Sequence, residues 1–256
     1  MSRHPCLPIP REQRFHQTDN CLYLISTTHN YHVFDDIHKD VDTNLTVLLD
    51  TLKNLRPGGG GVFNFISSWF VYGETTLPAS ENTPCHPKGF YSITKLAAEQ
   101  LLASYCQTFG ISYRILRLCN VYGPGDPGAS PKKNALHYLI GEMRHHRDIP
   151  LYHGGLFYRD YLHVDDVARA IDWCIHKAPL DCVINVGSGE KLLFLDLMTF
   201  ARDCLGSRSA FVRVSPPDFH RSVQVKDFIM DITVLKNLGF SPSITIQDGI
   251  KHLCQI

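Results

Sequence analysis

Apolar and polar positions alternate in two ways along the first half of the chain. Short apolar runs at 21–25 and 62–66 have the length and composition of buried parallel strands. Between them, apolar residues recur every three or four positions over 41–55, which predicts an amphipathic helix. The same spacing predicts a helix over 91–109, and the segment 112–121 that follows has the pattern of a strand.

After residue 125 the predicted elements become shorter and more mixed. Helices are expected over 134–146, 167–176, 193–204 and 246–254, and extended segments over 149–153, 183–186 and near Phe211. Asp165 is expected to be the N-cap of the helix over 167–176. Periodicity alone does not distinguish a small separate lobe from a continuation of one α/β domain.

Repeated alternation of strand and helix up to residue 125 predicts an α/β fold with a parallel sheet. The chain divides into three segments on this basis. Residues 1–18 carry prolines and charges without periodicity, so we expect a flexible lead-in there. Residues 19–125 contain the predicted sheet domain, and residues 126–256 contain the mixed elements.

Composition narrows the classes of partner and compartment. The chain has 256 residues, of which 44% are hydrophobic, and this is enough for a sizeable core. Its 25 basic and 25 acidic residues balance, so neither a nucleic acid nor an anionic membrane is an expected partner. The nine cysteines form no C-x-x-C pair, and no signal peptide or long apolar run occurs, so we expect a soluble cytoplasmic protein without a disulfide framework.

Four consecutive glycines, 58–61, follow the first predicted helix and precede a strand. A dinucleotide-binding turn has the opposite order, with its glycines after a strand and before the helix whose N-terminus meets the phosphates. The run also lacks G-x-G-x-x-G spacing and a P-loop lysine. We therefore interpret it as a helix stop and a loop.

A candidate catalytic group lies around Tyr91, Lys95 and the pair Ser67 and Ser68. Tyr91 and Lys95 are four positions apart, so they share one face of the predicted helix. A fixed cation near a tyrosine favours its phenolate, and a serine hydroxyl can hydrogen-bond a substrate oxygen. Such a trio can take a proton from a sugar hydroxyl while a hydride leaves the same carbon, although an isolated Tyr-x-x-x-Lys pair often arises by chance.

Four sequence blocks give this trio a context. They are FNFISSWFVYG at 63–73, YSITK at 91–95, RLCNVYGPG at 117–125 and RDYLHVDDV at 159–167. In this order they resemble the extended short-chain dehydrogenase/reductase family, specifically its NAD-dependent nucleotide-sugar epimerase/dehydratase branch. The likeness runs from about residue 19 to the C-terminus. It implies an N-terminally truncated Rossmann-like parallel sheet with a small C-terminal substrate-binding lobe.

The resemblance also implies roles for the candidate catalytic group. Ser68 matches the family's catalytic serine, Tyr91 its general acid/base, and Lys95 the residue that lowers the tyrosine pKa and binds the nicotinamide ribose. The expected cofactor is NAD or NADP, with Tyr91, Lys95 and Ser67 as contacts, although Ser67 is also placed to cap its strand. Proton removal by Tyr91 would accompany hydride transfer.

A nucleotide-sugar substrate is the partner that the resemblance implies. Asn120 matches an asparagine near the substrate diphosphate, and Arg159 and Arg221 match two arginines that grip it, a task suited to guanidinium forks. Tyr152 occupies the position of a residue against the nucleotide base, and Asn134 is a further candidate for a substrate contact.

Structural explanations compete with several of these roles. Asn120 could cap a strand end, and Tyr152 could be a core residue. Arg159 could be the ion-pair partner of Asp165 or Asp166. That acidic pair is better explained by a helix cap than by a metal site, so no metal is expected.

Two departures from the family pattern affect the expected activity. Trp69 and Phe70 stand where dehydratase members carry an Asp-Glu pair, which favours an epimerase, a reductase or a decarboxylase over a 4,6-dehydratase. The family's opening strand, glycine-rich turn and helix have no counterpart, so the run 21–25 is expected to form an apolar edge of the sheet.

Two hypotheses from different classes follow. The first is an NAD-dependent nucleotide-sugar epimerase, either as a homodimer or completed by another chain. The second is a catalytically inactive homologue that binds a nucleotide sugar or a protein partner through the remaining cleft.

Overall fold

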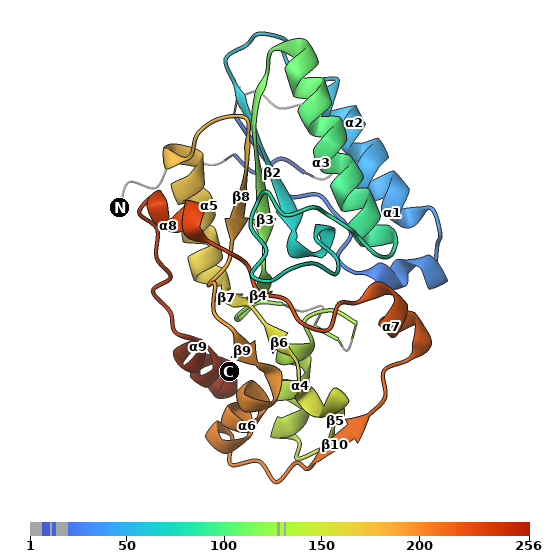
Figure 1. Ribbon diagram of the computed structural model, residues 1–256, viewed down its shortest axis with the longest axis vertical. Helices are drawn as coiled ribbons and strands as arrows, with labels where there is room; N and C mark the ends of the chain where they lie inside the picture. The colour runs from blue at the N-terminus through green and yellow to red at the C-terminus, as the bar shows by residue number, and fades with distance from the viewer. Residues whose placement is uncertain (1–6, 11, 14–19, 127–128, 131) are drawn as a thin grey trace.

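A computed structural model describes residues 7–10, 12–13, 20–126, 129–130 and 132–256. Most of the expected flexible lead-in, 1–18, lies outside these described residues. The described chain forms a sheet domain with helices on both faces and, at one end of the sheet, a smaller lobe (Figure 1).

Four parallel strands form the central sheet, in the order β1-β2-β3-β8. Their bounds are Cys21–Tyr23, Val62–Ser68, Ser112–Leu118 and Cys182–Val186. The parallel register places the end of β2 beside the end of β3, with Ser68 opposite Leu118. β2, β3 and β8 point toward the lobe (Figure 1), and β1 runs parallel to β2, so the carboxyl ends of all four strands face the lobe.

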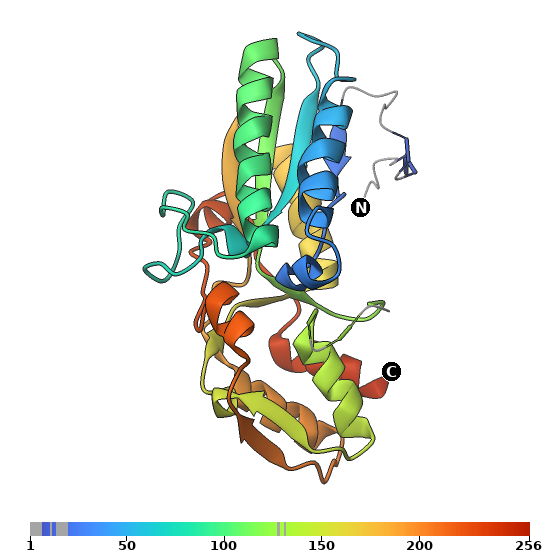
Figure 2. The same cartoon turned by 90° about the vertical axis from the view of Figure 1, so that its right-hand side faces the viewer.

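Two helical layers enclose the sheet (Figure 2). On one face, α1 (Lys39–Val41), the π-helical turn η2 (Asp42–Thr46) and α2 (Val47–Leu52) run as one segment beside α3 (Phe90–Phe109). On the other face lie α5 (Val164–Lys177) and α8 (Thr233–Asn237). Apolar side chains fill both interfaces, as expected for a sheet buried on both sides.

The lobe has its own hydrophobic core. Its elements are α4 (Ala135–Arg144), α6 (Phe194–Cys204), α9 (Ile246–Gln255) and the parallel pair β5 (Ile149–Tyr152) and β10 (Phe211–Val214). The sequence pattern left a separate lobe undecided, and the distinct core now supports one. α9 comes from the end of the chain but packs against α6 and α4.

The remaining elements are short. They are the 3-10 turns η1 (Asn30–Phe34), η3 (Trp69–Val71) and η4 (His153–Gly155), the strands β4 (Asn120–Tyr122), β6 (Tyr158–Arg159), β7 (Tyr161–His163) and β9 (Leu192–Leu193), and the helix α7 (Asp218–Val223). β4 pairs with β7 in parallel, and β6 pairs with β9 in an antiparallel arrangement.

Two predicted elements differ from the observed ones. The strand predicted over 112–121 is interrupted at Cys119, where the backbone amide donates to Val186 and the chain leaves the sheet to form β4. The helix predicted over 41–55 begins at Lys39, contains the π-helical turn and ends at Leu52. The segment 58–61 is a loop between α2 and β2, as predicted.

The predicted N-cap at Asp165 is wrong. The N-cap of α5 is His163, whose Nδ1 accepts from the Asp165 amide at 3.2 Å, because the helix begins at Val164. Asp166 is buried and accepts from the backbone amides of Ser243 and Ile244 at 2.8 and 2.9 Å. It therefore ties α5 to the segment that leads into α9.

β1 forms one edge of the sheet, as predicted for the apolar run 21–25. Leu22 and Leu24 are 38% and 66% exposed at this edge. The remaining side of β1 pairs with β2, the strand that ends at Ser68.

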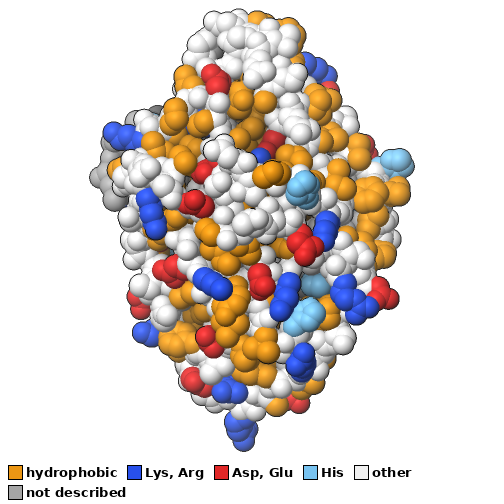
Figure 3. Space-filling model, in the orientation of Figure 1, with side chains coloured by type: hydrophobic (Ala, Val, Ile, Leu, Met, Phe, Trp, Pro, Cys, Tyr) orange, Lys and Arg blue, Asp and Glu red, His pale blue; other side chains and the backbone are white. Residues whose placement is uncertain are grey.

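Acidic and basic side chains are interspersed on the face shown in Figure 3. Among the described residues, no helix combines the length and apolarity that crossing a membrane requires. Within the same residues, His, Cys, Asp and Glu form no group of three that could hold a metal ion.

Two helical glycines offer a matched test of how the lobe packs. A Cβ atom on Gly249 in α9 would lie 2.2 Å from the hydroxyl oxygen of the buried Tyr122, whereas a Cβ atom on Gly141 in α4 would meet nothing within 4 Å. We expect Gly249→Ala to destabilise the protein by about 1–3 kcal/mol, as overpacking does. Gly141→Ala is expected to stabilise it by about 0.5–1 kcal/mol, because alanine favours the helix.

Urea denaturation of both variants measures the difference. Equal shifts of the two midpoints in the same direction would show that α9 does not approach Tyr122 as described.

Candidate active site

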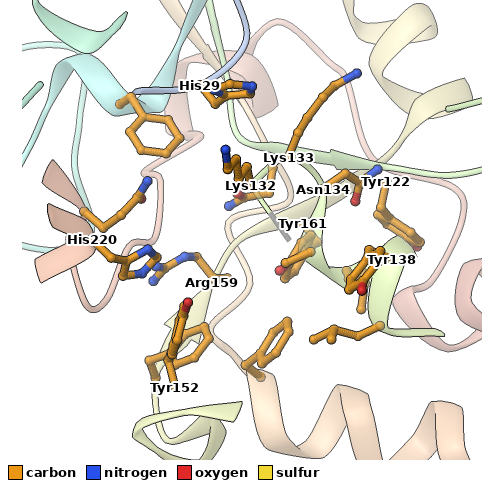
Figure 4. Close-up of a pocket in the computed structure, with 18 of the residues that line it drawn as sticks. His29, Tyr122, Lys132, Lys133, Asn134, Tyr138, Tyr152, Arg159, Tyr161 and His220 are labelled. Carbon is orange, nitrogen blue, oxygen red and sulfur yellow. The ribbon is translucent and has the colours of Figure 1, made fainter. Parts of the chain in front are cut away.

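A cavity of about 1150 Å³ lies between the carboxyl ends of the sheet strands and the lobe. This is the position at which open α/β sheets bind ligands. Its wall is formed by the ends of β2 and β4, the first turn of α3, the loop before α4, and the segments around Tyr152 and α7. Figure 4 shows side chains from both halves pointing into it.

Ser68 and Tyr91 both line this cavity. Ser68 is the last residue of β2, and Tyr91 lies in the first turn of α3, which begins after Gly89. Burial raises the pKa of Tyr91 above its usual value, and a hydrogen bond with the Ser68 side chain only partly opposes this effect. The structure thus brings together the hydroxyl groups of the predicted serine and tyrosine.

Lys95 does not take the position that its predicted role requires. Its ammonium donates to the Ile66 carbonyl oxygen at 2.6 Å and lies 4.1 Å from the centre of the Phe65 ring. Burial lowers the Lys95 pKa to about 7, although the nearby Glu99 carboxylate raises it. Lys95 therefore supports the end of β2 beneath the cavity, and the contact that lowers the Tyr91 pKa comes from Ser68.

Ser67, the third expected cofactor contact, faces the interior. It is buried, and its hydroxyl donates to the Glu99 carboxylate on α3. Glu99 also forms a buried ion pair with Arg117 of β3, with Nη2 and Oε2 2.7 Å apart. Ser67 and Ser68 point to opposite sides of β2, as neighbours in a strand do, so Ser67 joins the sheet to α3 instead of lining the cavity.

Asn120 and Asn134 line the cavity, but both also have structural partners. The Asn120 amide donates to the Asp160 carbonyl oxygen at 3.0 Å, which joins β4 to the start of β7. Asn134 is the N-cap of α4, and its amide donates to Asp126 at 3.1 Å. Asn120 therefore has the structural function at a strand end that was the alternative to substrate binding.

Arg159 lies at the cavity wall, and its guanidinium donates to three backbone carbonyl oxygens. These are Val225 at 2.8 Å, Tyr158 at 2.9 Å and Lys226. The alternative ion pair with Asp165 or Asp166 is wrong, since Asp166 pairs with Arg169 instead. Burial lowers the pKa of Arg159, but its charge is retained because arginine pKa values are so high.

Tyr152 and Arg221 come from two segments that meet at the cavity. Tyr152 lines the cavity, with its ring centre 4.7 Å from that of His220, so it is a wall residue and not part of the core. Arg221 also lines the cavity and donates to Asp218 and, at 3.1 Å, to the Pro216 carbonyl oxygen. Its side chain is half exposed.

Sequence reasoning missed several lining residues. They are His29, Tyr31, Lys132, Tyr138, Tyr161 and His220. They reach the cavity from segments that lie far apart in the sequence, so no single local pattern marks them as a group. Two of them lie next to candidates: His220 precedes Arg221, and Tyr161 lies in the block 159–167 that begins at Arg159.

The residues that line the cavity carry a net positive charge, although the formal net charge of the whole chain is zero. Among the described lining residues, six are Lys or Arg and four are Asp or Glu. Two of the acids are neutralised by lining lysines, Glu74 by Lys88 and Asp126 by Lys133. The arrangement therefore favours an anionic ligand.

Comparison with protein families identifies related sequences. Residues 14–187 match the model of the NAD dependent epimerase/dehydratase family. A putative UDP-glucose 4-epimerase from Methanocaldococcus jannaschii is 29% identical over 222 residues, which are 84% of this chain and 68% of that protein. An uncharacterised UDP-glucose epimerase from Bacillus subtilis is 28% identical over 215 residues, 82% of this chain and 64% of that protein. The chain thus spans about two thirds of the length of these relatives.

A solved structure shares the fold described above. The UDP-glucose 4-epimerase of Thermotoga maritima, solved with UDP-glucose, has a TM-score of 0.84 at 25% identity, covering 94% of this chain and 77% of that one. The Rossmann-like character of the sheet predicted from the sequence is therefore confirmed.

The described residues fit one end of a nicotinamide dinucleotide. Tyr91 and Ser68 face the cavity and would contact the nicotinamide ribose, whereas Lys95 lies beneath them with its ammonium on the Ile66 carbonyl oxygen. The glycines at 58–61 do not supply the pyrophosphate turn, because they precede β2 and so lie at the end of that strand opposite Ser68.

Proposed function

Because this chain belongs to the NAD dependent epimerase/dehydratase family, we propose that it acts on a nucleotide sugar as an epimerase. The observation that carries the proposal is the hydrogen bond between the Ser68 and Tyr91 hydroxyls, in the wall of a cavity whose lining residues carry a net positive charge. A nucleoside diphosphate supplies the negative charge that such a cavity accommodates.

Tyr91 is the proposed acid and base of the reaction. Its phenolate takes the proton from the sugar hydroxyl, and the C–H bond on the same carbon breaks to leave a keto group. NAD, when bound, supplies the hydride acceptor. Ser68 donates to the phenolate and so stabilises the charged form, opposing the effect of burial on the Tyr91 pKa. After the keto sugar has turned, the carbonyl carbon would take the hydride back and its oxygen would take the proton from Tyr91, which together restore the hydroxyl.

Aromatic residues favour the epimerase over a 4,6-dehydratase. Trp69 is buried, and its ring centre lies 4.1 Å from that of Phe70 and 4.5 Å from that of Phe228. Elimination of water needs a further acid and base beside the sugar. The positions after Ser68 provide apolar wall instead, with Phe70 lining the cavity.

A second candidate function is binding of a nucleotide sugar without turnover. The position of Lys95 favours it, because an ammonium held by the Ile66 carbonyl oxygen does less to stabilise a phenolate than one directed at Tyr91. In this case the cavity would retain affinity for the sugar nucleotide while the redox step is lost.

Titration calorimetry with UDP-glucose, with and without NAD, tests the proposal. We expect UDP-glucose to bind, and Arg159→Lys, which keeps the charge but not the planar fork, to weaken binding about tenfold, the loss of one charged hydrogen bond. Arg208→Lys, on the exposed surface, is the matched control. Turnover of UDP-glucose supports the epimerase, binding without turnover supports the second candidate, and absence of binding overturns both.

A further inference from the structure

One hydrogen bond connects the sheet domain to α7 across the cavity. The Tyr31 hydroxyl in η1 and Nδ1 of His220 in α7 are 2.8 Å apart, although 189 positions separate them in the sequence. Both residues line the cavity, and Figure 4 shows His220 beside Arg159 and Tyr152.

Both ends of this bond are held in place. The Asn30 side chain accepts from the Ser92 amide at 3.4 Å, which fixes η1 to the first turns of α3. The ring centres of Tyr31 and Phe34 lie 5.3 and 4.6 Å from that of Phe219, with edge-to-face geometry. The bond is therefore part of a packed junction and not an isolated surface contact.

The identity of the donor sets the tautomer of His220. A phenolic hydroxyl is more acidic than a neutral imidazole N–H, so the stronger hydrogen bond runs from the Tyr31 oxygen to Nδ1. Nδ1 then carries no proton, and the neutral ring has its N–H at Nε2. Burial, Arg159 and His153 lower the pKa of His220 to about 4, which keeps the ring neutral near pH 7.

From this geometry we infer that His220 is a ligand-binding residue whose Nε2–H donates to a phosphoryl oxygen of a nucleoside diphosphate, with Tyr31 as its positioning residue. The inference rests on the proposed function and assigns a further contact to the same cavity. Within the described residues, the structure gives Nε2 no protein acceptor, while Nδ1 is occupied by Tyr31.

The neighbours of His220 favour a phosphoryl oxygen as the acceptor. Arg159 supplies a positive charge close enough to lower the pKa of the imidazole, so an anionic oxygen between the two is attracted by the charge and accepts from the ring. The Tyr152 ring lies 4.7 Å from the imidazole, which is too close for a base to be sandwiched between the two rings. The ring edge, rather than its face, is therefore available to a ligand.

Two substitutions of His220 separate its two nitrogens. The amide nitrogen of Gln reaches the position of Nε2 and that of Asn reaches the position of Nδ1, so we compare His220→Gln with His220→Asn. By calorimetry with UDP, His220→Gln is expected to stay within about threefold of the wild-type Kd, and His220→Asn to weaken binding about tenfold, as for one lost hydrogen bond to a charged group.

Tyr31→Phe tests the positioning role with a readout other than affinity. The ¹⁵N chemical shifts of the His220 ring report which nitrogen carries the proton, and in the wild type we expect protonated Nε2 and bare Nδ1. Tyr31→Phe should shift this pattern and weaken UDP binding by about threefold to tenfold, the range for one hydrogen bond.

Equal UDP affinities of the Gln and Asn variants and the wild type would overturn the inference while leaving the proposed function intact. A ring protonated at Nδ1 in the wild type would also overturn it. Absence of UDP binding to the wild type would remove the proposed function, and the inference with it.

Discussion

Tyr91→Phe is expected to lower the turnover of a UDP-hexose by about 10²- to 10⁴-fold, the usual contribution of a positioned acid and base. The substitution removes one oxygen atom and leaves the ring that packs at the cavity wall beside Phe70. The affinity for UDP should therefore change little, and the loss should appear in kcat. Steady-state kinetics with NAD present, together with calorimetry, measure the two quantities separately.

Tyr105→Phe provides the matched control on the same helix. Tyr105 lies in α3 and packs against Phe109, away from the residues that line the cavity. We expect its variant to retain wild-type turnover. A Tyr91→Phe variant that also retains turnover would contradict the assignment of Tyr91 as the proton acceptor.

Arg117→Ala is expected to lower the free energy of unfolding by about 3–5 kcal/mol, the cost of leaving one partner of a buried ion pair alone. The side chains of Arg117 and Glu99 are only 6% and 4% exposed. The guanidinium also lies 4.7 Å from the centre of the Tyr72 ring, and the Tyr72 hydroxyl donates to Asn185 of β8 at 2.6 Å. Its removal thus affects three strands and α3 together. Urea denaturation gives the difference.

Two further variants show whether burial causes this effect. Replacing both partners with apolar residues, Glu99→Leu with Arg117→Met, should cost less than Arg117→Ala, because no charge is left unpaired. Arg147→Ala removes an exposed ion pair with Glu142 and should shift the urea midpoint much less than Arg117→Ala does. Similar losses from Arg117→Ala and Arg147→Ala would show that the Glu99 pair is hydrated.

The sheet domain could be predicted from the sequence because local patterns determine most of it. The apolar runs that became β1 and β2, and the helical spacing that became α3, are properties of adjacent residues. The break at Cys119 could not be predicted in this way. It depends on the hydrogen bond from the Cys119 amide to Val186, a residue in a later strand.

In the candidate site, too, local sequence patterns identify some residues, while tertiary contacts determine the position of others. Ser68 and Tyr91 were identified from short blocks, and the structure brings their hydroxyls together. Helical spacing predicts that Lys95 and Tyr91 leave α3 on the same side, so the ammonium was expected to share the cleft with the Tyr91 hydroxyl. The spacing does not determine where the end of the long lysine side chain lies. Its final direction is set by the Ile66 carbonyl oxygen, and His220 meets Tyr31 through folding alone.

The contacts that hold α5 and those that hold α7 differ in kind. On the α5 side, Asp166 binds two backbone amides and the Ser243 hydroxyl ahead of α9, and it also pairs with Arg169. On the α7 side, the described contacts with the sheet domain include one hydrogen bond, aromatic edges and the packing of Val223 beside Gly89. Because charged hydrogen bonds hold the α5 side, we expect α7, with Arg221, to be displaced more easily than α5. Ligand release is thus expected to begin on that side, while Ser68 and Tyr91 keep their places.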